Sequence, residues 1–197
     1  MSKTLNISLV GVGGQGTLLA SEILCQVALL SGKDVKKSEV HGMAQRGGSV
    51  VSQVRIGDKV HSPLIALGET DILIAFEKLE ALRHAHFLAP DGVAMVNDQE
   101  IRPVTVSSGQ AAWPEDLDGM LRSAFPKLEL IPALKMAREL GSVRTMNVVM
   151  IGALSNYTEI EDAVWQESIK ALVKPQFVNL NLMAFEAGKK ACCSVSL

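Results

Sequence analysis

The chain has 197 residues, of which 48% are hydrophobic and 20% are charged, and its formal net charge is −2. This length and composition predict a globular protein with one domain and a substantial buried core, and they exclude a disordered chain. Aromatic residues make up only 4%, and a nucleic-acid-binding protein would need a basic surface or rings for base stacking, so that class is disfavoured.

Strands and helices alternate through the first half of the chain. Runs of apolar or β-branched residues predict the strands, and apolar side chains at helical spacing predict the helices. The predicted elements up to residue 96 are, in order, strand 5–10, helix 17–30, strand 33–40, loop 41–48, strand 49–56, strand 72–76, helix 77–88 and strand 93–96. The strand at 33–40 alternates with polar residues, so we expect it at a less buried position in the sheet.

The second half of the chain is predicted to be mostly helical. The elements expected there are strand 104–106, helix 115–124, strand 128–131, helix 132–140, helix 143–157, helix 159–172 and helix 176–190. The helix at 143–157 is apolar on nearly every side, which is typical of a deeply buried helix. Asn147, near its beginning, is expected to form hydrogen bonds with a neighbouring loop or to cap the helix.

The order of these elements predicts the fold class. Apolar strands that alternate with helices indicate a three-layer, Rossmann-like α/β/α fold with a mostly parallel, mixed sheet, as one domain over residues 1–197. Gly57 and Asp58 predict a turn into a short return strand at 59–62, which would form a β-hairpin insertion with the strand at 49–56.

A glycine-rich loop joins the first strand to the first helix. Gly11, Gly13 and Gly16 satisfy the pattern G-x-G-x-x-G in the strand–turn–helix context that the pattern requires. In that context the backbone N–H groups and the positive end of the helix dipole face a phosphate. The binding residues expected here are Gly11, Gly13, Gly14, Gln15 and Gly16. The alternative is a tight turn whose glycines serve packing alone.

A dinucleotide site would need one more residue. An acidic side chain about 20 residues after the glycine loop, at the end of the second strand, holds the ribose in such sites. Glu39 is the best candidate, but it lies 28 residues after Gly11. This late position weakens the interpretation as a free-standing NAD(P)-binding oxidoreductase, which stays as the alternative.

A second glycine loop contains Arg46, Gly47 and Gly48. Two glycines after an arginine allow a sharp turn that projects the guanidinium group, an arrangement suited to a phosphate or a carboxylate. A solvated or ion-paired arginine is the competing interpretation. His41 precedes this loop as a candidate base or ligand, although an isolated loop histidine is more often a structural hydrogen-bond donor.

The cysteines and the apolar runs limit what else the chain contains. Cys25, Cys192 and Cys193 include no C-x-x-C pair, so we expect no disulfide framework and no metal or iron–sulfur site in this chain. The first residues lack the pattern of a signal peptide, and no apolar run approaches the length of a membrane span. The sequence therefore predicts a cytoplasmic protein.

Four segments together resemble one family, the gamma-type subunit or domain of 2-oxoacid:ferredoxin oxidoreductases. They are Val10-Gly-Val-Gly-Gly-Gln-Gly16, His41-Gly-Met-Ala-Gln-Arg-Gly-Gly-Ser49, Asp71-Ile-Leu-Ile-Ala-Phe-Glu77 and Asn147-Val-Val-Met-Ile-Gly-Ala153. The resemblance runs over nearly the whole chain in the same order. The residues Gly42-Met-Ala-Gln-Arg46 are closer to the small (beta) subunit of indolepyruvate:ferredoxin oxidoreductase than to pyruvate-type members.

The resemblance implies a role within a larger complex. Such a complex decarboxylates a 2-oxoacid on thiamine diphosphate, passes electrons through iron–sulfur clusters to ferredoxin, and transfers the acyl group to coenzyme A. The thiamine and cluster sites are then expected in a large partner subunit, and no catalytic residue is expected in this chain. By analogy, Gly13 to Gly16 and Arg46 to Gly48 would contact the phosphates of coenzyme A or the partner subunit. Homodimerisation and a purely structural interaction module both stay open.

Overall fold

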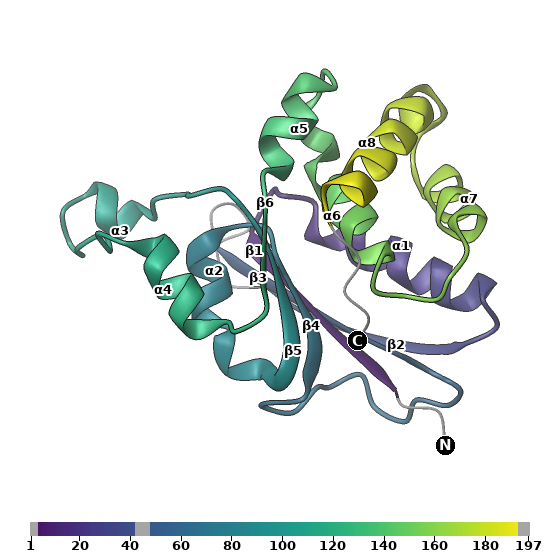
Figure 1. Cartoon of the computed structure of the whole chain (residues 1–197), viewed down its shortest axis with the longest axis horizontal. Helices are drawn as coiled ribbons and strands as arrows, with labels where there is room; N and C mark the ends of the chain where they lie inside the picture. The colour runs from purple at the N-terminus through teal and green to yellow at the C-terminus, as the bar shows by residue number, and fades with distance from the viewer. Residues whose placement is uncertain (1–3, 42–47, 193–197) are drawn as a thin grey trace.

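The computed structural model describes residues 4–41 and 48–192, and its centre is a six-stranded mixed sheet (Figure 1). The strands are β1 (Leu5–Val12), β2 (Asp34–His41), β3 (Ser49–Gly57), β4 (Thr70–Ala75), β5 (Leu88–Asn97) and β6 (Leu128–Ile131). Their order across the sheet is β2-β3-β1-β4-β5-β6. β1, β4, β5 and β6 run parallel, whereas β3 is antiparallel to both of its neighbours. The predicted mixed, mostly parallel sheet is confirmed, and β2 is an edge strand, as its polar pattern indicated.

Helices cover both faces of the sheet and give the three layers that the sequence predicted. The helices are α1 (Thr17–Leu30), α2 (Lys78–Arg83), α3 (Val104–Ser107), α4 (Leu117–Ala124), α5 (Ala133–Glu139), α6 (Met146–Ser155), α7 (Asp162–Leu172) and α8 (Val178–Ala191), with single 3-10 turns η1 (Ala85–Phe87), η2 (Val143–Thr145) and η3 (Pro175–Phe177). In Figure 1, α1 and α5 to α8 lie on one side of the sheet, and α2 and α4 lie on the other. None of these helices is long and apolar enough to cross a lipid bilayer.

Each face of the sheet has its own hydrophobic core. Side chains alternate along a strand, so Ile7 and Leu9 of β1 face the larger core, which also holds Trp165 and Phe185. Val10 points the opposite way, into the smaller core beneath α2 and α4. The sheet is therefore buried on both faces at β1, and the turn that follows β1 stands on a rigid base.

The helices α6 and α8 approach each other closely because each carries a glycine at the contact. A Cβ atom on Gly152 would overlap the carbonyl oxygen of Phe185, and one on Gly188 would overlap the carbonyl oxygen of Val149. All ten residues of α6 are buried, as the sequence predicted for this apolar helix. The pair holds α6 in place, and the beginning of α6 lies beside the glycine loop, where Asn147 contacts Gly16.

Two predicted strands are wrong. Residues 59–62 form no strand, and β3 pairs antiparallel with β2 and β1 instead. The segment after β3 is held by side chains, since Asp34 Oδ2 accepts from the N–H of Val60 (2.8 Å) and Gln53 Oε1 accepts from that of Ile65 (3.1 Å). The predicted strand at 104–106 is the short helix α3, because the segment has no neighbouring strand to pair with and Val104 is 82% exposed.

Candidate functional site

The glycine loop lies at the carboxyl end of β1, where α1 begins. Gly14 has a φ of 103° and Gly16 a φ of 83°, a left-handed backbone that favours glycine. A Cβ atom on Gly16 would lie 2.5 Å from Nδ2 of Asn147, whereas one on Gly14 would meet nothing within 4 Å. Gly16 is therefore required by packing, and Gly14 leaves an open, exposed approach to the backbone.

Gln15 is folded back into the protein. Its Oε1 accepts a hydrogen bond from the N–H of Val12 (2.7 Å), and its Nε2 donates to the carbonyl of Phe76 (2.9 Å) and to Oε1 of Gln99 (3.1 Å). The side chain fills the space above Gly11, where an added Cβ atom would lie 2.9 Å from Oε1. Gln15 thus joins the ends of β1 and β4 and holds the loop in place.

Asn97, at the end of β5, extends this connection to the next elements. Its side chain is fully buried, and its Nδ2 donates to the carbonyl of Phe76 (3.0 Å) and to Oε1 of Gln99 (3.0 Å). Its Oδ1 accepts from the N–H of Leu134 in α5 (3.1 Å). Asn97 and Gln99 are not among the site residues predicted from the sequence, although a polar residue directly after an apolar strand is a signal that could have identified them.

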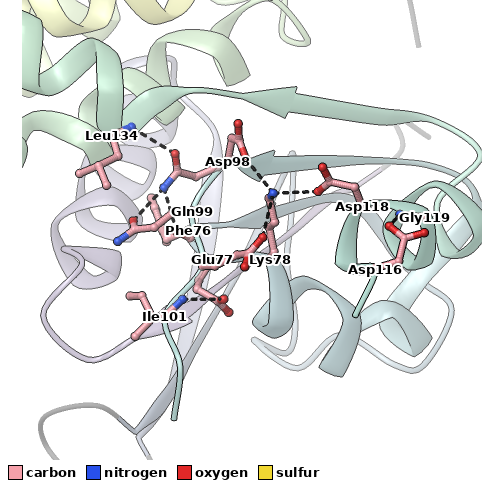
Figure 2. A network of polar contacts seen from close by, with 12 residues as sticks. Phe76, Glu77, Lys78, Asp98, Gln99, Ile101, Asp116, Asp118, Gly119 and Leu134 are labelled. Carbon is pink, nitrogen blue, oxygen red and sulfur yellow. Dashed lines mark hydrogen bonds and ion pairs between the residues drawn. The ribbon is translucent and has the colours of Figure 1, made fainter. Parts of the chain in front are cut away.

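The ammonium group of Lys78, at the beginning of α2, is buried near the carboxyl ends of β4 and β5 (Figure 2). Nζ of Lys78 lies 2.8 Å from Asp98, 2.7 Å from Asp118 and 3.3 Å from Glu100, and Lys78 is 5% exposed. Burial alone would lower the pKa of this lysine, but the carboxylates of Asp118 and Asp98 outweigh it and hold the pKa above its usual range. We call these four residues, Lys78, Asp98, Glu100 and Asp118, the Lys78 cluster. Its role is structural, and its lysine stays charged.

Glu77, beside Lys78, is almost fully buried and caps α2. Its carboxylate accepts from the N–H of Glu80 (2.8 Å) and from the N–H of Ile101 (3.2 Å). Burial raises the pKa of this carboxyl, and the backbone hydrogen bonds oppose that change.

Within residues 4–41 and 48–192, no group of three His, Cys, Asp or Glu side chains could hold a metal ion.

The glycine loop contacts Gly48, the last residue of the second predicted loop. The N–H of Gly13 donates to the carbonyl of Gly48 (2.9 Å), and the hydroxyl of Ser49 donates to the buried carboxylate of Glu80. Arg46 and Gly47 lie outside the described residues. His41 ends β2, where it pairs with Val50. The start of β3 is therefore fixed on one side to the glycine loop and on the other to α2.

A cleft of about 380 Å³ opens beside the glycine loop. It is lined by Gly14, Gln15, Gly16, Leu19, Gln99, Leu134, Val143, Arg144, Met146 and Asn147. The first-turn N–H groups of α1 have no partner within the helix, and Arg144 on the opposite wall is an exposed cation. The lining contains no carboxylate, so the cleft favours an anion.

Asn147 forms a hydrogen bond with the glycine loop, the role that the sequence predicted for it. It is 2% exposed, and its Nδ2 donates to the carbonyl of Gly16 (3.1 Å). Glu39, the candidate ribose-binding acid, lies in β2 and is engaged by Lys37 (2.8 Å) and by the hydroxyl of Ser21 (3.2 Å). These contacts give Glu39 a structural role on the α1 side of the sheet and remove the main support for a dinucleotide site.

The chain belongs to the pyruvate ferredoxin/flavodoxin oxidoreductase family, whose model matches residues 6–191. It is 43% identical to the indolepyruvate oxidoreductase subunit IorB of Archaeoglobus fulgidus, over 93% of both chains. The family predicted from the four segments, which include the two glycine loops, is thus confirmed, and the chain is an oxidoreductase subunit. Nothing in these likenesses supports a free-standing NAD(P)-binding enzyme.

Solved structures share the fold. The gamma subunit of a keto/oxoacid ferredoxin oxidoreductase from Geobacter sulfurreducens superposes with a TM-score of 0.71 at 24% identity, covering 95% of this chain and 97% of that one. The 2-oxoglutarate:ferredoxin oxidoreductase of Magnetococcus marinus, solved with 2-oxoglutarate, coenzyme A and succinyl-CoA bound, gives 0.74 at 21% identity. The likeness covers 100% of this chain and only 32% of that one, so in that protein the fold is part of a longer polypeptide.

Proposed function

We propose that this chain is the small subunit of an indolepyruvate-type 2-oxoacid:ferredoxin oxidoreductase. The observation that carries the proposal is the 43% identity to an indolepyruvate oxidoreductase subunit over 93% of both chains. The complex would convert an aryl 2-oxoacid to an acyl-CoA and pass the electrons to ferredoxin in the cytoplasm. Residues 1–197 would form one gamma-type domain, and a large partner subunit would hold thiamine diphosphate and the iron–sulfur clusters.

The contribution of this chain would be to bind coenzyme A and to help close the active site. The binding residues are Gly11, Gly13, Gly14, Gln15 and Gly16, together with Arg46, Gly47 and Gly48. Three features support this assignment: the exposed backbone at Gly14, the beginning of α1, and the contact between Gly13 and Gly48. Backbone N–H groups and a guanidinium group would bind the diphosphate of coenzyme A as charge-assisted donors. Gln15 would act by holding the loop in its conformation.

The complex itself is tested by co-expression with a candidate large subunit. The small chain carries the tag, and the purified material is assayed for reduction of ferredoxin with indolepyruvate, pyruvate or 2-oxoglutarate as substrate. We expect the two chains to co-purify and indolepyruvate to give the highest kcat/KM. If the large chain never co-purifies and is fully active alone, the proposal is wrong.

The coenzyme A assignment has a separate test. We expect Arg46→Ala to raise the KM for coenzyme A about tenfold or more, because a charged hydrogen bond to the phosphate is lost, with the KM for indolepyruvate unchanged. Arg122→Ala is the matched control, since Arg122 is exposed on α4 and does not line the cleft. An unchanged KM for coenzyme A in Arg46→Ala would favour a purely structural module.

A further inference from the structure

A second concave surface adjoins the glycine-loop cleft. It is a groove of about 320 Å³ that shares Leu19 and Arg144 with that cleft. We call it the α1–α8 groove, and its lining is Leu19, Ser142, Arg144, Thr145, Leu172, Val173, Lys174, Phe177, Leu180 and Asn181. The groove lies where the beginning of α1 meets the junction of α7 and α8, and nothing in the proposed binding of coenzyme A uses that junction.

Large apolar side chains are exposed at the groove. Leu172 is 37% exposed and Phe177 is 42% exposed, and Val143, on the neighbouring wall of the cleft, is 49% exposed. Exposed apolar residues that gather around a concave surface mark an interaction site more often than scattered ones do. An aromatic residue at such a site is a common anchor of a protein–protein interface.

The uncharged polar side chains of the groove are already satisfied within the chain. Ser142 Oγ accepts from the N–H of Arg144 (3.3 Å), and Thr145 Oγ1 donates to the carbonyl of Ser142 (2.9 Å). Asn181 Nδ2 donates to the carbonyl of Phe177 (2.8 Å). A site for a small polar ligand needs converging free donors and acceptors, and these contacts leave few of them. The groove therefore favours an apolar side chain as its occupant.

The positive charge of the groove indicates which charge its occupant carries. Arg144 and Lys174 are both exposed, no carboxylate lines the groove, and no ion pair to either residue forms among residues 4–41 and 48–192. This local positive charge contrasts with the net charge of −2 of the chain. A partner with carboxylates around its apolar anchor complements it.

The rim of the groove is also preformed. Pro175 follows Lys174 and restricts the backbone, and the N–H of Phe177 donates to the carbonyl of Lys174 (2.9 Å). The hydrogen bond from Asn181 then joins this 3-10 turn to α8. A preformed surface loses little conformational freedom on binding, so it suits a lasting subunit interface.

We propose that the α1–α8 groove docks a segment of the large partner subunit, with a bulky apolar or aromatic side chain in the groove and carboxylates beside Arg144 and Lys174. The proposal rests on the proposed function only in that such a partner exists. Because the groove and the cleft share Leu19 and Arg144, docking at the groove would also fix one wall of the cleft.

The experiment measures the affinity of purified small chain for purified large subunit at low and high salt. We expect Phe177→Ala and Lys174→Glu each to weaken binding at least about tenfold, and Lys174→Glu also to reduce the salt dependence. The matched controls are Leu30→Ala, which truncates a side chain of equal exposure (42%) at the far end of α1, and Lys59→Glu after β3. Both controls should bind as the wild type does.

The outcomes separate the docking surface from the proposed function. If wild-type small chain does not bind the large subunit, the proposed function fails and the docking proposal fails with it. If the wild type binds and both groove variants bind equally well, the docking proposal alone is wrong. It is also overturned if the variants weaken self-association or coenzyme A binding while large-subunit affinity is unchanged. Thermal melting of each variant, together with Lys174→Ala, excludes misfolding as the cause of a loss.

Discussion

At the scale of single residues, the glycine loop combines positions that serve packing with a position that leaves space for a ligand. The G-x-G-x-x-G pattern predicted the turn correctly, because the pattern reflects local backbone geometry. The role of Gln15 could not be predicted in the same way. Its partners Phe76 and Gln99 lie 61 and 84 residues away in the sequence, and only the folded sheet brings them to the loop.

Gly16 should tolerate no side chain. We expect Gly16→Ala to lower the free energy of unfolding by about 2 kcal/mol, from the left-handed backbone and the overlap with Asn147. In an Asn147→Ala background the overlap is removed, so the cost of Gly16→Ala should fall to about 1 kcal/mol. Denaturant unfolding of the four proteins in this cycle measures both values. Strictly additive effects would contradict the packing role of Gly16.

The Lys78 cluster should give the protein a pH-dependent part of its stability. The folded-state pKa of Lys78 is raised above the unfolded value, so its contribution is present below the unfolded pKa of lysine, about 10.4, and is lost as the pH rises toward the folded value. We expect Lys78→Met to cost about 2 kcal/mol at pH 8, because the carboxylates of Asp98 and Asp118 lose their partner.

Denaturant unfolding of wild type and Lys78→Met from pH 8 to 11 tests this expectation. The difference between the two should shrink as the pH passes 10.4. Lys33→Met is the control, since its ion pair with Asp58 is exposed and should contribute less than about 1 kcal/mol. A constant difference across the pH range would mean that the loss in Lys78→Met comes from packing of the lysine stem.

At the scale of elements, the sequence predicted best where one element's own pattern determined its structure, although the helix predicted at 77–88 ends at Arg83 and β5 begins at Leu88. The helix α1 begins and ends as predicted, and so does β6. The two strands that were predicted wrongly are segments whose conformation depends on contacts with other parts of the chain. The β-branched segment at 104–106 finds no strand to pair with and becomes helical, and residues 59–62 are held by Asp34 and Gln53 rather than by a strand ladder.

The contact between α6 and α8 should depend on its glycines. In a helix, Gly→Ala usually stabilises by up to about 1 kcal/mol, but here the added methyl group would overlap the backbone of the facing helix. We therefore expect Gly188→Ala to destabilise the protein by about 3 kcal/mol. Asn179→Ala, at an exposed position of α8, should be neutral or slightly stabilising. Thermal melting that shows Gly188→Ala to be stabilising would contradict this packing.

At the scale of the whole molecule, the fold presents the glycine loop after β1, Gly48 and the polar connections at one edge of the sheet. Gln15, Gln99 and Asn97 connect the ends of β1, β4 and β5, and Gly13 connects to Gly48. The sequence predicted the family because the four segments that resemble it are local motifs. It could not predict the cleft and the adjoining groove, because their walls come from α1, α5, η2, α6, α7, η3 and α8, which meet only in the fold.

The most direct test of the central claim is a titration of the purified small chain into the purified large subunit. Ferredoxin reduction is followed with saturating indolepyruvate and coenzyme A. A subunit that binds coenzyme A and closes the active site should raise the rate in proportion to its concentration until an equimolar ratio is reached, and should lower the KM for coenzyme A. A large subunit that has the same rate and the same KM with and without this chain would contradict the claim.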